Sequence, residues 1–305
     1  MNRLNSLSEG EGVIAMLVAC GPPAIEPLQR MLLTGRPSTI FQPRQWAVMA
    51  LAQLDAKDAL LAYLSFEREV PDAATRWGED AVQSTAARAL ARWKTDNRVF
   101  DCLMTLLAGK HLQGAIYAIG EIGRADAIPI LIRALGDDVA RRSAEEALRK
   151  FGEVARDSLL ETARTPDPSR RYESPSSVIR RRSALGLFSE LPVRQVDFES
   201  VEPLIDDDDP ELAVRAARFL VNSEFREKKL LALSRMIGLI PMADWLVQSE
   251  IEEVLISNFE LLSSRIEREI EARSAGSEMS GRDDRVLRMF MKVRRIAVES
   301  SRDVA

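Results

Sequence analysis

The sequence offers few residues that could carry catalysis. Its single histidine, His111, is the only imidazole available to a metal site or to a Ser-His-Asp triad. No Cys-x-x-Cys pair, glycine-rich phosphate loop or nucleophile elbow occurs. The acidic run 206–209 lacks the alternating ligands and the glycine of a calcium loop, and we expect it to be a turn whose last members cap a helix beginning at Pro210. We therefore expect a protein that is not an enzyme and holds no metal or cofactor; the alternative is an active site built from carboxylates alone.

Binding chemistry is better represented, above all in the segment Arg164–Arg182. It contains six Arg and two acidic residues, a local excess of positive charge in a chain whose net charge is −5. Tyr172 follows Arg170 and Arg171, and such a group could bind a peptide, a phosphate or a nucleic-acid backbone. The alternative is a solvated loop of variable length, since its three prolines prevent either flanking helix from continuing.

Two other segments, 34–44 and 67–80, also combine Arg with aromatic residues. Arg36 lies in the first, and Arg76 and Trp77 lie in the second. Aromatic and Arg side chains are enriched at the centres of protein interfaces. We expect these residues to bind a partner, with Trp77 on the surface.

The elements that must position these residues form an internal repeat. Segments of one pattern, with small residues on one face and a closing Ala-Leu or Gly, begin at residues 43, 82, 111, 140, 179 and 214, and four of them have Arg near the start. Amphipathic stretches with apolar residues at i, i+3, i+4 and i+7 precede them at 24–33, 59–66, 99–107, 127–135, 155–163 and 196–205. One such helical pair cannot bury its apolar face alone, and stacking of neighbouring pairs does so. Because the three Arg-containing segments all precede a second helix, we expect them to emerge along one edge of the stack.

The pattern Arg-x-x-Ala-x-x-Ala-Leu-x-x-x-Gly in 141–152, with Asp137 and Asp138 just before it, resembles a HEAT repeat. The resemblance covers about residues 20–225, and the 29-residue units resemble the short bacterial kind named after phycobilisome lyases. It implies a right-handed all-α solenoid of about six to seven helical pairs that serves as a scaffold or adaptor.

The resemblance also implies a ladder of Arg side chains, each paired with an Asp in a turn of its own or a neighbouring repeat. The residues at this position are Arg44, Arg141, Arg180 and Arg215. Arg suits forked contacts to carboxylates. The alternative is an anion-binding stripe along the inner surface.

Composition agrees with a helical array and with a reducing, cytoplasmic location. Aromatic residues make up only 6% of the chain, and no stretch approaches the ~18 apolar residues of a membrane span. Cys20 and Cys102 lie in helical patterns, so we expect two reduced thiols in the core. Arg accounts for 35 of 42 basic residues, which hints at a bacterial source.

We expect one continuous domain with a repeat solenoid over 1–225, a divergent pair over 226–274 with helices at 228–240 and 249–262, and a linker with a C-terminal capping helix over 275–305. The leading hypothesis is a non-catalytic scaffold that binds another protein through its inner groove and loop-bearing edge. The residues proposed to contact the partner are Arg36, Arg76, Trp77, Arg170, Arg171 and Tyr172. The alternatives are a bilin-lyase-like accessory factor, by resemblance, and a nucleic-acid-binding repeat protein, which the net negative charge disfavours.

Overall fold

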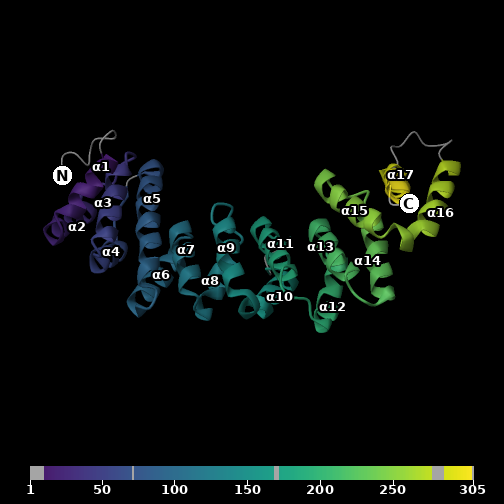
Figure 1. Ribbon diagram of the computed structural model, residues 1–305, viewed down its shortest axis with the longest axis horizontal. Coiled ribbons are helices and arrows are strands. Elements are labelled where there is room, and N and C mark those ends of the chain that lie inside the picture. The colour runs from purple at the N-terminus through teal and green to yellow at the C-terminus, as the bar shows by residue number, and fades with distance from the viewer. Residues whose placement is uncertain (1–9, 71, 168–171, 277–284, 304–305) are drawn as a thin grey trace. The chain divides into compact units, whose positions relative to one another are not determined.

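The computed structural model describes residues 10–70, 72–167, 172–276 and 285–303, and every element in these ranges is an α-helix or a short 3₁₀-helix (Figure 1). The predicted fold class, an all-α solenoid, is confirmed. The chain divides into two compact units. Unit 1 comprises residues 1–159 and 167–187, and unit 2 comprises 160–166 and 188–305.

Unit 1 consists of helical pairs stacked in two layers. The first layer holds α2 (Ile25–Thr34), α4 (Lys57–Leu64), α6 (Asn97–Gly109) and α8 (Ile128–Ala134). The second layer holds α1 (Gly10–Ala19), α3 (Gln42–Gln53), α5 (Ala73–Leu90), α7 (Gln113–Ile122) and α9 (Arg141–Phe151). Helices α10 (Arg156–Arg164) and α11 (Pro175–Ser189) follow, and the boundary between the two units passes through both.

Small residues bring the second-layer helices close together. A Cβ added at Gly114 of α7 would lie 1.8 Å from the carbonyl oxygen of Ser84 in α5, and one at Gly120 would lie 2.9 Å from the Cβ of Ala147 in α9. A larger residue at either position would therefore push the neighbouring helices apart. Gly123 ends α7 in the left-handed conformation, with φ of 71°, and its N–H donates to the carbonyl of Ile119.

Every predicted helix of the repeats is present, but two second helices begin earlier than predicted. Helix α5 begins at Ala73 rather than near Val82, and α11 begins at Pro175 rather than near Ile179. The insertion over 67–80 is therefore a short loop followed by two extra turns of α5. Asp72 caps these turns by accepting a hydrogen bond from the N–H of Thr75 (2.9 Å).

Unit 2 continues with helices of different length. They are α12 (Gln195–Val201), α13 (Pro210–Val221), α14 (Arg226–Leu239), α15 (Trp245–Ser257), α16 (Phe259–Gly276) and α17 (Arg285–Asp303). The single helix predicted over 249–262 is in fact two, because the Asn258 side chain donates to the carbonyl of Val254 (2.8 Å) and ends α15 there. Helix α17 packs on α15 and α16 and buries Val286, Phe290 and Val293.

Three other sequence predictions can be compared with the structure. Both cysteines are free, yet Cys20 is exposed rather than in the core, because it lies in the turn after α1; Cys102 is half-buried. Within the described ranges, no helix has both the length and the apolarity that crossing a membrane requires. The predicted boundaries at 225 and 274 stay predictions, and residues 277–284 of the predicted linker lie outside the described residues.

Candidate partner-binding surface

A buried ion pair connects the first two helical pairs. Arg44 of α3 is 5% exposed and binds Glu79 of α5, which is 2% exposed, through both terminal nitrogens. The Arg44 guanidinium also donates to the carbonyl of Leu32 (2.9 Å), and the Tyr63 hydroxyl of α4 donates to Glu79 Oε1 (2.7 Å). Burial, followed by the charge of Glu79, raises the pKa of Tyr63 far above its usual value, so its hydroxyl remains a donor. This cluster fixes the start of α5 against α3 and α4.

Arg68 joins the two loops that precede α3 and α5. Its guanidinium donates to the carbonyls of Gly35 (2.6 Å), Leu33 (2.7 Å) and Leu32, which form the C-terminal end of α2. It forms no ion pair with a residue that the structure describes. Burial, and then the nearby charge of Arg44, lower the pKa of Arg68. The sequence analysis did not select this residue, although it lies in the 67–80 insertion.

Ile40, Phe41 and Trp77 form an aromatic patch where the segment before α3 meets the start of α5. The rings of Phe41 and Trp77 meet edge to face, with centroids 5.2 Å apart. Trp77 is nonetheless 67% exposed, and Ile40 is exposed as well. A Cβ added at Gly78 would lie 2.6 Å from the carbonyl oxygen of Ser38, so the segment before α3 sits directly on α5. The prediction that Trp77 lies at the surface is confirmed, but it lies on a helix rather than in a loop.

A cationic cavity adjoins the aromatic patch. It has a volume of about 620 Å³ and is lined by Arg68, Glu69, Val70, Arg76 and Lys110. The Lys110 ammonium donates to Asp80 (2.6 Å) and Gln83 (3.0 Å). Arg76 is exposed and forms no ion pair with any described residue. Arg36 is also exposed and directly follows Gly35, whose carbonyl accepts from Arg68.

The third Arg-containing segment is only partly described. Arg170 and Arg171 lie outside the described residues, and Tyr172 is 77% exposed before α11. The end of this segment is anchored in unit 1, where Arg181 pairs with Glu173 (2.8 Å). The structure thus brings Arg76 and Trp77 together with the 35–41 segment, whereas α7 and α9 separate Tyr172 from them.

All four Arg of the predicted ladder pair with a carboxylate, in three different settings. Arg141 pairs with Asp138 (2.9 Å) and Arg180 with Asp167 (2.7 Å), both in the preceding turn. Arg44 pairs with Glu79 of the next repeat, and Arg215 pairs with Glu211 of its own helix (2.8 Å). Two of the four partners are therefore Glu rather than Asp, because those Arg side chains reach a helix and not a turn. Only the Arg44 pair is buried on both sides.

A comparison with family models found a match to HEAT repeats over residues 72–149, which span α5 and most of α9. The chain carries HEAT repeats. The predicted resemblance is thereby confirmed, although the phycobilisome-lyase-type subgroup is not. No curated protein was found to match the chain. HEAT repeats commonly mediate protein interactions.

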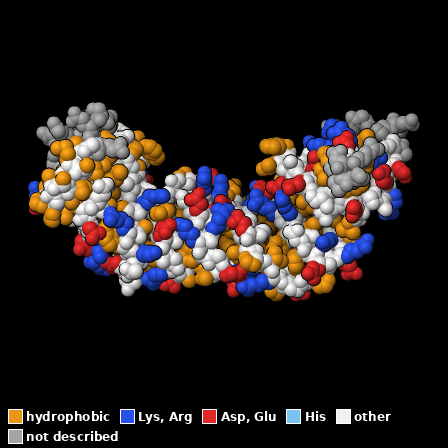
Figure 2. Space-filling model, viewed as in Figure 1, with side chains coloured by type: hydrophobic (Ala, Val, Ile, Leu, Met, Phe, Trp, Pro, Cys, Tyr) orange, Lys and Arg blue, Asp and Glu red, His pale blue; other side chains and the backbone are white. Residues whose placement is uncertain are grey.

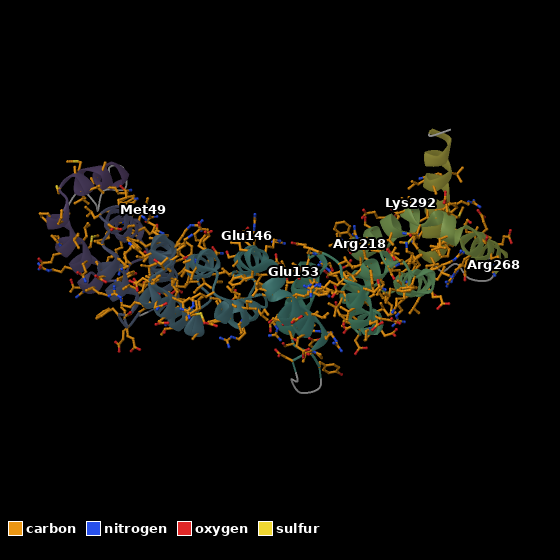
Figure 3. All side chains as sticks on the ribbon, turned by 60° about the horizontal axis from the view of Figure 1, so that its bottom comes forward. Met49, Glu146, Glu153, Arg218, Arg268 and Lys292 are labelled. Atoms are coloured by element: carbon orange, nitrogen blue, oxygen red, sulfur yellow. The ribbon has the colours of Figure 1, made fainter. Side chains whose placement is uncertain are left out.

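The open face of the second-layer HEAT helices carries a second row of charged and aromatic residues. Tyr117 of α7 lies between Arg88 of α5, at 3.8 Å from its ring centroid, and Lys150 of α9, at 4.9 Å. Figure 3 labels Met49 of α3 and Glu146 of α9, two further side chains of the second-layer helices. Arg88 and Lys150 thus contact Tyr117 from the two neighbouring helices, and Lys150 also pairs with Glu121 of α7.

Unit 2 exposes an apolar cluster that sequence analysis missed. Trp245 is 79% exposed at the start of α15, and Met242 and Leu246 beside it are exposed too (Figure 2). Asp244 caps this helix by accepting from the N–H of Val247 (2.9 Å). The Asp cap directly before a Trp was a visible signal, but the predicted helix began four residues later.

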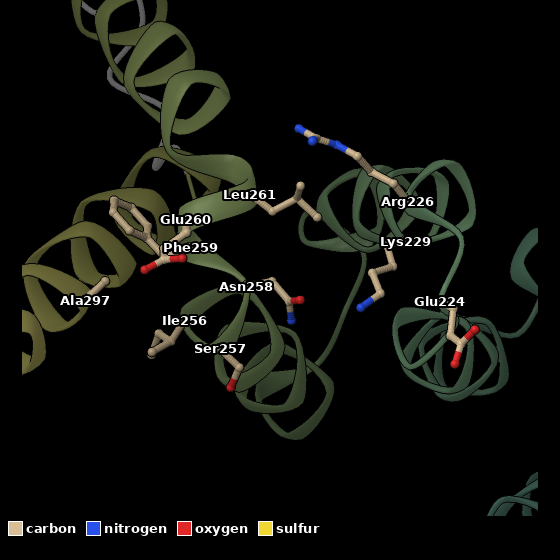
Figure 4. A pocket seen from close by; sticks show the side chains of 10 residues that line it. All are labelled: Glu224, Arg226, Lys229, Ile256, Ser257, Asn258, Phe259, Glu260, Leu261 and Ala297. Atoms are coloured by element: carbon tan, nitrogen blue, oxygen red, sulfur yellow. The ribbon is translucent and has the colours of Figure 1, made fainter. Parts of the chain in front are cut away.

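Unit 2 also contains an open cavity of about 950 Å³ near the C-terminal helices. Figure 4 shows Arg226 and Lys229 of α14 on one side and Asn258 and Leu261 on the other. Glu224 and Glu260 also line it, so acids and bases balance. The charges that line the cavity therefore favour neither an anionic nor a cationic ligand.

The residues considered for catalysis occupy ordinary structural positions. Asp209 caps α13 by accepting from the N–H of Leu212 (2.9 Å), so the prediction of an acidic capping turn is confirmed. His111 Nδ1 lies 3.3 Å from Asp137 Oδ2 in a turn of unit 1. Within the described residues, no group of three or more His, Cys, Asp or Glu is arranged to hold a metal ion.

Proposed function

We propose that this chain is a non-catalytic scaffold or adaptor that binds a partner protein through the loop-bearing edge of unit 1. The proposed contact surface is the aromatic patch together with Arg36 and Arg76. Tyr172, Arg170 and Arg171 stay proposed contact residues as well, although Arg170 and Arg171 lie outside the described residues. The observation that carries the proposal is Trp77, which stays 67% exposed although its ring meets that of Phe41 edge to face.

A large exposed aromatic side chain loses contact with water when a partner covers it, and that transfer is favourable. Trp and Arg are also the residues most often found at energetic hot spots of interfaces. Here the exposed side chains share the 36–41 segment and the start of α5 with Arg36 and Arg76, which are exposed and form no ion pair within the described part of the chain. Apolar area and charge are thus available on one surface.

The scaffold beneath the patch supports the same conclusion. Gly78 brings the 38–41 segment onto α5, and the buried Arg44–Glu79 pair holds α5 against α3. A binding surface that is already ordered loses less conformational entropy when the partner binds. The extra turns of α5 therefore present Trp77 on a rigid element.

The test is affinity capture from a cell extract with the wild-type chain and the Trp77→Ala variant, each with and without nuclease. We expect a protein that survives nuclease and is captured at least ~10-fold less by the variant. Trp245→Ala is the matched control, since it removes an equally exposed Trp from unit 2 and should leave capture unchanged.

Equal capture by both Trp variants would contradict the proposal. Capture of nucleic acid alone, released by salt, would replace it with the nucleic-acid-binding alternative, because contacts to phosphates weaken steeply as salt rises.

A further inference from the structure

We infer that the cationic cavity binds a carboxylate side chain of the partner, so that the partner segment carries an acidic residue within a few positions of an apolar residue that covers Trp77. This inference rests on the proposed function and adds the chemistry of the partner. The occupant is an acidic and apolar protein segment rather than a nucleic acid or a membrane.

The charges that line the cavity are unequal. Three cations, Arg68, Arg76 and Lys110, face one acid, Glu69. Lys110 already has Asp80 as its partner, and Arg68 donates to the carbonyl oxygens at the end of α2. Neither Arg68 nor Arg76 forms an ion pair with a described residue, but the guanidinium of Arg76, unlike that of Arg68, also makes no hydrogen bond within the described part of the chain. An incoming carboxylate would therefore find a forked donor that is not yet occupied.

The neighbouring charge beneath the cavity adds to this preference. Arg44 lies next to Arg68, and its charge, together with burial, lowers the pKa of Arg68. Because Glu79 already pairs with Arg44, a negative charge in the cavity would chiefly stabilise the guanidinium groups of Arg68 and Arg76. The same wall contains Glu69, which would oppose a second negative charge at the site. A monovalent carboxylate therefore fits this balance better than a doubly charged phosphate.

The cavity and the aromatic patch can be reached by one short segment. Arg76 and Trp77 are consecutive residues of α5, so their side chains leave the helix about 100° apart and within one turn. Arg76 lines the cavity, and Trp77 contacts Phe41 in the patch. A peptide that places an acidic side chain on Arg76 has neighbouring side chains above Trp77.

The experiment uses the full chain and fluorescent peptide pools in an anisotropy titration. One pool has a fixed Phe with Glu residues on both sides and small residues elsewhere; the matched pool has Gln in place of each Glu. A third pool has phosphoserine in place of each Glu. We expect the Glu pool to bind about 10-fold more tightly than the Gln pool, and its affinity to fall as salt is added.

The variants separate the charge from the apolar contact. Arg76→Gln, alone or with Lys110→Gln, should remove most of the difference between the Glu and Gln pools while the thermal midpoint stays unchanged. Trp77→Ala should weaken both pools. Arg142→Gln is the matched control, because Arg142 of α9 is an exposed cation outside the cavity. This variant should bind both pools as the wild type does.

The outcomes distinguish this inference from the proposed function. If Trp77→Ala abolishes partner capture while the Glu and Gln pools bind equally, the cavity does not select an acid and only the inference fails. Tighter binding of the phosphoserine pool, or an equal loss with Arg142→Gln, would also overturn it. Unchanged capture by Trp77→Ala would instead overturn the proposed function.

Discussion

The second helical pair, α4 and α5, differs from the two compact pairs that follow it. The repeat segments that begin at 82, 111 and 140 are spaced by 29 residues, whereas the segment at 43 lies 39 residues before the one at 82. Helix α5 has 18 residues, while α7 has 10 and α9 has 11. The added residues form the 65–72 loop and the extra turns of α5.

The two kinds of repeat also differ in whether their ion pairs are exposed or buried. In the compact pairs, turn residues form exposed pairs such as Arg141 with Asp138. In the second pair, the ion pair of Arg44 with Glu79 is buried, and Trp77 is left at the surface above it. An insertion in a HEAT array can thus be an ordered structural element that supports a binding surface.

The largest effect expected from this contrast is on the buried pair. Glu79→Ala should lower the free energy of unfolding by about 3–5 kcal/mol, because it leaves Arg44 buried without a carboxylate. Urea unfolding followed by circular dichroism measures this loss. The triple variant Arg44→Met, Tyr63→Phe and Glu79→Leu removes every polar group of the cluster and should recover most of the loss; failure to recover would mean that the pair itself contributes net stability.

The next effect concerns the close approach of the 38–41 segment to α5. Gly78→Ala places a Cβ 2.6 Å from the Ser38 carbonyl oxygen, so the backbone must shift, at a cost of about 1–3 kcal/mol. Gly109→Ala is the control, since no atom lies within 4 Å of its added Cβ, and it should change stability by less than about 1 kcal/mol. Equal losses in the two variants would show that the segment does not rest on α5.

A smaller effect is expected for an exposed pair of a compact repeat. Asp138→Ala removes the partner of Arg141 but should cost only about 0–1 kcal/mol, because Asp138 is 79% exposed and water solvates the remaining charge. The same unfolding experiment measures it. A loss as large as that of Glu79→Ala would remove the distinction between the two kinds of repeat.

The smallest effect is a dependence on pH at the start of α5. Asp72 accepts hydrogen bonds from the backbone N–H and from the hydroxyl of Thr75. Both bonds lower the pKa of Asp72, and the bond from the N–H has the larger effect. Because the folded-state pKa lies below the unfolded value of about 3.9, the cap is fully present above that pH and is lost as pH falls through the folded pKa. Hydrogen exchange at the Thr75 amide should therefore accelerate in acid relative to an Asp72→Asn variant, which keeps a neutral cap. If the exchange rate of the Thr75 amide changed with pH in the same way in both proteins, this role of Asp72 would be contradicted.

Much of the candidate surface could be predicted from residue types and spacing. Arg76 and Trp77 were selected because they interrupt a regular repeat, and the structure places both on one surface with the 35–41 segment. The helical state of residues 73–80 was missed, because Gly78 and Thr75 favour helices weakly. Its cause is tertiary: Gly78 packs on Ser38, and Glu79 binds Arg44.

Arg68 and Glu79 were missed for a related reason. Each lies in a charged stretch that is typical of a solvated loop. Nothing in the sequence shows that Glu79 is buried or that Arg68 reaches the end of α2. Trp245 was missed because the predicted helix began four residues too late, beyond the Asp244 cap.

The sequence by itself determined that the chain is an array of helical pairs, because apolar periodicity and small residues at fixed spacing have few other ways to be buried. It also determined where the array departs from regularity. Only the tertiary structure decided what each departure does, since burial, partners and exposure depend on residues distant in the chain. Glu79 and Trp77 lie two residues apart along α5, yet packing against α3 and α4 buries Glu79 and leaves Trp77 exposed.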